Sequence, residues 1–138
     1  MPNHKRQRRV AFPPKMEGFK PFGIPATELT TVTLLFEELE AIRLIDYEGL
    51  MQDDAAAMMN ISRPTFTRIY NKAHKTIAKA FIESKAILIR GGNYIADNYW
   101  YKCEKCKEVM VALKPLSSCR NCQSHNIVLL NSDIMPTH

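Results

Sequence analysis

The chain has 138 residues, of which 46% are hydrophobic, so it resembles a globular protein more than a disordered one. Its apolar runs fall far short of the roughly 20 residues that span a bilayer, and no apolar stretch follows the basic N-terminus as in a signal peptide. These features argue against a transmembrane helix and against a signal peptide. We therefore expect a cytoplasmic protein.

The net charge of +5 is unevenly distributed along the chain. Residues 1–20 carry six basic residues and one acid, residues 27–54 carry eight acids and one base, and residues 62–85 carry six basic residues and one acid. An acidic block between two basic ones predicts that one surface meets a polyanion while another faces away. Solvated charge without a partner is the alternative interpretation.

Residues 1–26 are predicted to form a basic, proline-rich arm. Five prolines and two glycines exclude a long regular element there, while interleaved apolar residues predict that part of the arm packs onto the body. The arm is expected to run along a nucleic-acid backbone or into a minor groove. Its candidate DNA contacts are Arg6, Arg8 and Arg9.

Hydrophobic periodicity predicts three helices in residues 27–98. The first spans about Leu34–Tyr47, the second about Met51–Met59, and the third follows Ser62 as its N-cap and reaches about Lys85. Beyond them, the apolar residues from Ala86, a glycine turn and a return segment to Ala96 predict a short β-hairpin.

The spacing between Gln52 and Asn71 fits a helix-turn-helix, in which two helices cross steeply after a short turn. Ala56 occupies the position where the helices come closest. Asn60 occupies the turn position that requires a positive φ, where asparagine is a common substitute for glycine. The second helix of such a unit must turn apolar residues inward, as Phe66 and Ile69 would.

The third predicted helix has an apolar stripe and a basic, hydrogen-bonding face opposite it. Such a face suits the major groove, where side chains at the helix N-terminus read base edges and lysines hold phosphates. The candidates for base edges are Arg63, Thr65, Thr67, Arg68 and Asn71. The candidates for phosphates are Lys72, Lys75 and Lys79. A solvated amphipathic helix is the alternative.

Three segments of this region resemble a known family: residues 35–44, residues 48–50 and residues 61–69, together with the arm's Arg8–Pro13 and Phe19–Pro25. They are similar to the DUF134 (UPF0251) family of predicted prokaryotic DNA-binding proteins. The helical part also resembles region 4 of sigma-70 factors, which implies a fold like that of promoter −35 readers. Fold kinship alone does not establish function.

Four cysteines form two CxxC pairs separated by twelve residues: Cys103, Cys106, Cys119 and Cys122. Four thiolates at this spacing predict a tetrahedral structural zinc site of the zinc-ribbon type, in residues 99–138. The segment between the pairs, residues 107–118, has the length of a β-hairpin. Iron in a rubredoxin-like site, a disulfide and a redox-active dithiol are the competing interpretations.

The sequence thus predicts a mainly α fold: a sigma-70 region 4-like helix-turn-helix domain with a short β-hairpin and a small C-terminal β zinc ribbon. The predicted function is sequence-specific binding of double-stranded DNA, as a transcriptional regulator that is not an enzyme. A single helix-turn-helix contacts few bases, so a homodimer is expected, because two copies together would bind DNA more tightly. The alternative is an adaptor whose acidic first helix and zinc ribbon dock on a protein such as RNA polymerase.

Overall fold

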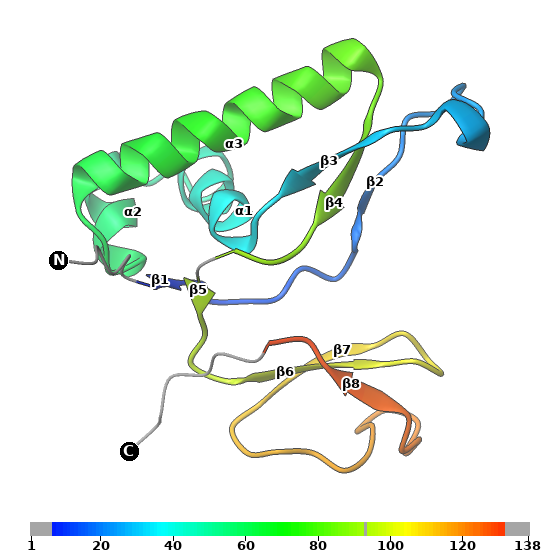
Figure 1. Ribbon diagram of the computed structural model, residues 1–138. Coiled ribbons are helices and arrows are strands. Elements are labelled where there is room, and N and C mark those ends of the chain that lie inside the picture. The colour runs from blue at the N-terminus through cyan, green and yellow to red at the C-terminus, as the bar shows by residue number, and fades with distance from the viewer. Residues whose placement is uncertain (1–6, 93, 132–138) are drawn as a thin grey trace, which may run out of the picture. The chain divides into compact units, whose positions relative to one another are not determined.

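The computed structural model describes residues 7–92 and 94–131 (Figure 1). The chain divides into two compact units. The first, called the helical unit, comprises Met1–Arg9 and Met16–Tyr94. The second, called the cysteine unit, comprises Val10–Lys15 and Ile95–His138. In the described part of the chain, no helix is both long and apolar enough to cross a bilayer.

The helical unit contains three α-helices, as far as the chain is described: α1 (Phe36–Ile42), α2 (Gln52–Met58) and α3 (Arg63–Glu83). A π-helical turn, η2 (Arg43–Tyr47), prolongs α1. Helix α1 begins where the Glu38 carboxylate accepts a hydrogen bond from the backbone of Leu35. Helix α3 begins at Ser62, whose hydroxyl accepts from the backbone of Thr65, and ends at Ser84 in the left-handed conformation.

A three-stranded sheet lies beside the C-terminal part of α3 (Figure 1). Its order is β2 (Gly18–Phe19), β4 (Ala86–Ile89), β3 (Thr31–Leu34). Strand β4 runs antiparallel to β2 and parallel to β3, because the three helices connect β3 to β4. A 3-10 turn, η1 (Ala26–Glu28), precedes β3, and β1 (Arg8–Arg9) pairs with β5 (Tyr94–Ile95).

The mainly α fold class is wrong, because eight strands form three sheets in the described residues. The predicted hairpin Ala86–Ala96 does not form either. Strand β4 is buried and pairs with β2 and β3, two segments distant in sequence. Residues 31–34 form strand β3 instead of leading into the first helix. An apolar run indicates a buried strand but not its partners, which explains the wrong hairpin.

Two apolar clusters of described residues lie in the core of the helical unit. The first packs α1 and η2 against α2 and the N-terminal half of α3, and includes Leu44, Ala56, Met59 and Phe66. The second packs the sheet against α1 and the C-terminal half of α3, and includes Leu34, Ala80, Ile87 and Ile89. Helix α3 therefore contributes to both clusters and runs the length of the unit (Figure 1).

The cysteine unit contains an antiparallel sheet of order β7-β6-β8, with β6 (Tyr99–Cys103), β7 (Val109–Ala112) and β8 (Ile127–Leu129). The hairpin predicted within residues 107–118 is therefore wrong. The apolar residues of this segment form a single strand, β7, which pairs with the preceding strand β6, and the first CxxC pair lies at the connection between the two strands. Trp100, the only tryptophan, is fully buried on the central strand.

Candidate nucleic-acid interface and metal centre

The turn between α2 and α3 has the geometry expected from its sequence. Asn60 adopts a positive φ of 58°, and the backbone of Ile61 donates to the carbonyl of Ala56 at 3.0 Å. Ala56 is buried. Across the two helices, the Thr67 hydroxyl donates to the Gln52 side chain at 2.6 Å. These contacts fix the orientation of α3 relative to α2.

Helix α3 has one buried and one exposed face. Its buried residues are Phe66, Ile69, Ala73 and Ala80. The predicted DNA contacts Arg63, Arg68, Asn71, Lys72, Lys75 and Lys79 are exposed, as are Phe81 and Ile82 near the end of the helix. Thr65 and Thr67 are half-buried, and Thr67 is already bonded to α2. Arg68, Asn71, Lys75 and Lys79, with Lys72 beside them, follow one another along this exposed side, which we call the α3 outer face, and Arg63 lies at its N-terminal end near Asp53.

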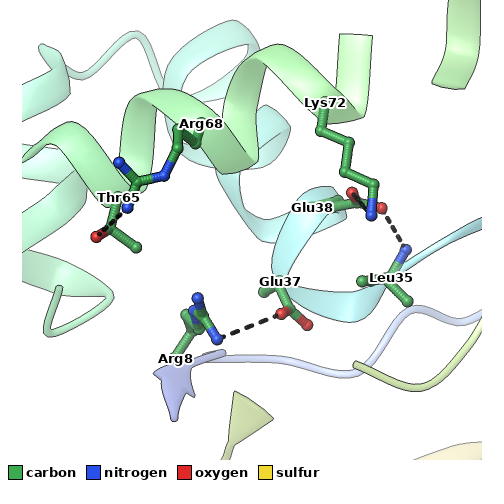
Figure 2. A network of polar contacts seen from close by, with 7 residues as sticks. All are labelled: Arg8, Leu35, Glu37, Glu38, Thr65, Arg68 and Lys72. Atoms are coloured by element: carbon green, nitrogen blue, oxygen red, sulfur yellow. Dashed lines mark hydrogen bonds and ion pairs between the residues drawn. The ribbon is translucent and has the colours of Figure 1, made fainter. Parts of the chain in front are cut away.

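Polar contacts orient the N-terminal side chains of this face. Arg68 donates from Nη2 to the Thr65 hydroxyl at 3.1 Å (Figure 2). The Thr65 hydroxyl also lies 3.0 Å from that of Ser62, the N-cap. The Arg63 guanidinium lies 3.5 Å from a carboxylate oxygen of Asp53 on α2. Arg68 is thus held against its own helix while remaining exposed.

Three acids of α1 (Glu37, Glu38 and Glu40) are buried rather than exposed, which the charge pattern did not predict. Glu38 accepts from the Leu35 backbone with one oxygen, and its other oxygen lies 3.7 Å from Lys72 Nζ on α3 (Figure 2). Glu40 binds Arg43 at 2.7 Å, and this hydrogen bond raises the pKa of Arg43. Helical periodicity could have indicated burial, because Glu37 and Ala41 lie on one face.

The arm residues do not form a uniformly exposed basic segment. The Arg8 side chain is only 11% exposed, and its guanidinium lies 4.0 Å from the Glu37 carboxylate (Figure 2). Arg9 is half-buried, and its backbone N–H donates to the carbonyl of Met59. Arg6 lies outside the described residues.

A polar cluster that the sequence analysis did not predict joins α3 to η2. Asp46 accepts from the Tyr70 hydroxyl at 2.8 Å, and its other oxygen lies 2.9 Å from His74 Nε2. Burial, reinforced by this hydrogen bond, raises the pKa of Tyr70. No sequence motif marks such a contact, because the partners are 24 and 28 residues apart.

In the cysteine unit, the two CxxC pairs form matching turns. The Cys103 backbone donates to the carbonyl of Glu108, and the Cys119 backbone donates to that of Ser124, each five residues ahead. The return bonds run from Lys107 to the Cys103 carbonyl and from Gln123 to the Cys119 carbonyl. Lys107 and Gln123 both adopt positive φ, 66° and 61°. The same backbone turn therefore occurs twice.

These turns bring the four thiols together. The sulfur of Cys103 lies 3.6 Å from that of Cys122, and the sulfur of Cys106 lies 3.7 Å from that of Cys119. All four sulfurs lie within 4.8 Å of one another. A metal with bonds of about 2.3 Å to four sulfurs in a tetrahedron separates them by about 3.8 Å. The cluster is compatible with a metal site, as predicted.

Hydrogen bonds to the sulfurs favour the thiolate form of two cysteines. The Cys106 backbone donates to Cys103 and lowers its pKa. The Asn121 side chain donates to Cys106 and lowers its pKa to about 6. At Cys122 the backbone of Ser124 lowers the pKa, but burial and the neighbouring thiols outweigh it and raise the pKa to about 11. Four thiolates repel one another unless a cation compensates their charge.

The helical unit thus has a tight turn between α2 and α3, and the cysteine unit has a four-thiol cluster. Comparison with known proteins identifies the family. The chain belongs to the family described as "Protein of unknown function DUF134", which matches residues 1–97. This confirms the resemblance to the DUF134 (UPF0251) family that was inferred from the sequence. The family match ends before the cysteines.

Relatives extend the similarity further along the chain. A "UPF0251 protein" of Methanothermobacter thermautotrophicus is 38% identical over 137 residues, 99% of this chain and 71% of the relative. One from Caldicellulosiruptor saccharolyticus is 45% identical over 127 residues, 92% of this chain and 88% of the relative. One from Halothermothrix orenii is 46% identical over 101 residues, 73% of this chain and 75% of the relative. No solved structure matches.

Proposed function

We propose that this chain binds double-stranded DNA in a sequence-specific manner, with α3 in the major groove, and acts as a transcriptional regulator. The observation that carries the proposal is the α3 outer face: cations and an amide lie exposed on one side of a helix that is buried on the other. A helix of this kind fits the major groove, where arginine pairs with guanine and asparagine with adenine.

The contacts divide by their distance from the start of α3. Arg63, Arg68 and Asn71 lie in its first turns and would reach base edges. The Thr65 hydroxyl would orient Arg68. We leave Thr67 out of the base contacts because its hydroxyl is bonded to Gln52. Lys72, Lys75 and Lys79 follow along the exposed face and would contact phosphates.

The contribution of the arm is smaller in this proposal than its charge suggests. The Arg8 guanidinium is nearly buried beside Glu37, so we leave it out of the DNA surface. Arg6 and Arg9 remain candidates for contacts with the backbone. The principal attraction for DNA would then come from α3, and three phosphate-contacting lysines predict a log–log salt slope of about −3.

We further propose that the metal is zinc and that its role is structural. The sulfur separations suit a tetrahedral ion, and four protein ligands leave no open position for catalysis. The zinc would stabilise the two CxxC turns and the sheet between them. Iron suits the same ligand set, so the element bound by the purified protein tests this part of the proposal.

The adaptor function is less well supported. It required an acidic outer face on the first helix, but Glu37, Glu38 and Glu40 are buried and paired with cations of the same unit or with backbone. A partner such as RNA polymerase would therefore not meet those carboxylates as a charged surface. DNA binding through α3 needs no such exposure.

Selection of bound fragments from genomic DNA, followed by fluorescence anisotropy at two salt concentrations, tests the proposed function. Arg68→Ala should reduce the preference for the selected sequence over random DNA, by about ten-fold for one lost bidentate base contact. Lys75→Ala should weaken both DNAs about equally and reduce the salt slope by about 1. Lys114→Ala, which removes the same charge from the cysteine unit, serves as the control.

Two results would contradict the proposal. One is the absence of any preference for selected over random DNA. The other is equal weakening by Lys114→Ala and Lys75→Ala, which would place the DNA contact away from α3. Retention of preference in Arg68→Ala would mean that other side chains read the bases.

A further inference from the structure

The second apolar cluster of the helical unit opens into a cavity of about 460 Å³. The cavity lies between the C-terminal half of α3, helix α1 and the three-stranded sheet. Buried or half-buried side chains of these elements form most of its wall: Leu34, Leu39, Ile42, Ile77, Ala80, Ile87 and Ile89. Its volume lies within the roughly 300–1,000 Å³ that small-molecule sites occupy.

The mouth of the cavity has aromatic and cationic side chains. Phe19 and Phe81 line it although they are 60% and 73% exposed. The charged residues in the lining are Lys20 and Lys85, and no acid belongs to it. Lys85 lies 3.8 Å from Glu83, which balances part of its charge. Lys20 is exposed and has no ion-pair partner among the described residues.

We propose that this cavity binds a small amphipathic carboxylate, with its apolar body against the isoleucines and its carboxylate beside Lys20. The apolar wall would bury a hydrocarbon chain or ring, which water disfavours. The lysines at the mouth would attract an anionic end and disfavour a cationic one. A medium-chain fatty acid has this chemistry. The inference does not depend on DNA binding.

A second copy of the chain fits the same opening less well. In a dimer whose twofold axis passes through this opening, the two lysine-bearing mouths would face each other. Like charges brought together across an interface oppose association. A carboxylate, by contrast, complements the lysines. This charge difference decides between the two occupants.

Decanoate below its micellar concentration is the probe, and isothermal titration calorimetry of the full chain is the measurement. Decanoate should bind with one-to-one stoichiometry, whereas decyltrimethylammonium, which has the same chain and the opposite charge, should bind far more weakly. Methyl NMR signals of Ile77, Ile87 and Ile89, which line the cavity, should shift with decanoate. Those of Ile61 and Ile69, in the first cluster, should not.

Two neighbouring residues of α3 supply matched variants. Phe81 and Ile82 are 73% and 85% exposed, so neither substitution should unfold the chain, and only Phe81 lines the cavity. Phe81→Glu puts a negative charge at the mouth and should weaken decanoate binding about ten-fold, whereas Ile82→Glu should change it less than about two-fold. Lys20→Gln should weaken it about three- to five-fold, as expected for an exposed charge pair.

Three results would overturn the proposal. The first is the absence of saturable decanoate binding. The second is equal binding of decanoate and decyltrimethylammonium, or equal effects of Phe81→Glu and Ile82→Glu. The third is a dimer in sedimentation velocity that Phe81→Glu dissociates and Ile82→Glu does not, because a second copy would then cover the cavity.

Discussion

The helical unit and the cysteine unit are stabilised in different ways. In the described part of the helical unit, the 21-residue helix α3 contributes to two apolar clusters. In the cysteine unit, the cluster around Tyr101 and Met110 includes the cysteines themselves. Two of the cysteines, Cys103 and Cys119, are among the most buried side chains of the chain. The thiols thus occupy positions that apolar side chains fill in the helical unit.

This difference has a thermodynamic consequence. Burial of apolar surface stabilises a domain in proportion to its area, and short segments bury too little to offset their conformational entropy. A bound ion can supply the missing free energy, about 10–16 kcal/mol for structural zinc. The helical unit should therefore fold without metal, and the cysteine unit should depend on it.

Metal removal should have the largest effect. Chelation, or Cys119→Ser, should unfold the cysteine unit, because the four thiols would lose the proposed ion, which contributes about 10–16 kcal/mol if it is structural zinc. Trp100 is the only tryptophan, is fully buried and belongs to this unit, so its emission should shift to the red. The helical signal in far-UV circular dichroism should persist. Ser118→Ala is the control, and loss of the helical signal on chelation would contradict the comparison.

Phe66→Ala should destabilise the helical unit and leave the cysteine unit folded. Phe66 is fully buried in the first cluster, and its truncation should cost the helical unit about 3–5 kcal/mol. Urea unfolding followed by circular dichroism measures this loss, and elemental analysis should give unchanged metal content. Phe81→Ala, at a position that is 73% exposed, should cost less than about 1 kcal/mol. Similar losses for both variants would refute the assigned core.

Gly18→Ala should destabilise the sheet of the helical unit. A Cβ at Gly18 would lie 1.9 Å from the backbone carbonyl oxygen of Ile87 on β4, which side-chain rotation cannot relieve. We expect a loss of about 2–3 kcal/mol, as for overpacking. Gly23 also has a positive φ but open space around it, so Gly23→Ala should cost only about 1 kcal/mol of backbone strain. If Gly18→Ala and Gly23→Ala lose the same stability in thermal unfolding, the close approach of Gly18 to the Ile87 carbonyl is not the cause.

The smallest effect concerns the turn between α2 and α3. Asn60 is left-handed, so Asn60→Ala should cost about 1 kcal/mol, whereas Asn60→Gly should be neutral or slightly stabilising. Chemical unfolding of the helical unit measures both. Greater stability of the alanine variant would mean that the turn relaxes to another conformation.

Local features were predicted well and distant pairings were not. The periodicity located all three helices, and Ser62 and Asn60 have the cap and turn conformations expected of them. Strand β4 was recognised as an extended segment but assigned the wrong partner. The acidic block suggested an exposed face, yet Glu38 is buried beneath Lys72. Charge counts along a sequence do not reveal which carboxylates have a cation across the fold.

The sequence was sufficient to predict the α2–turn–α3 geometry and the tight turn that each CxxC pair forms. Both depend on residues a few positions apart, whose backbone conformation and side-chain chemistry are local properties. Three other features depend on the tertiary structure: the β2-β4-β3 order, the burial of Arg8 beside Glu37, and the cavity that Phe19 and Phe81 line. Each requires segments tens of residues apart to meet, and such meetings depend on how the whole chain packs.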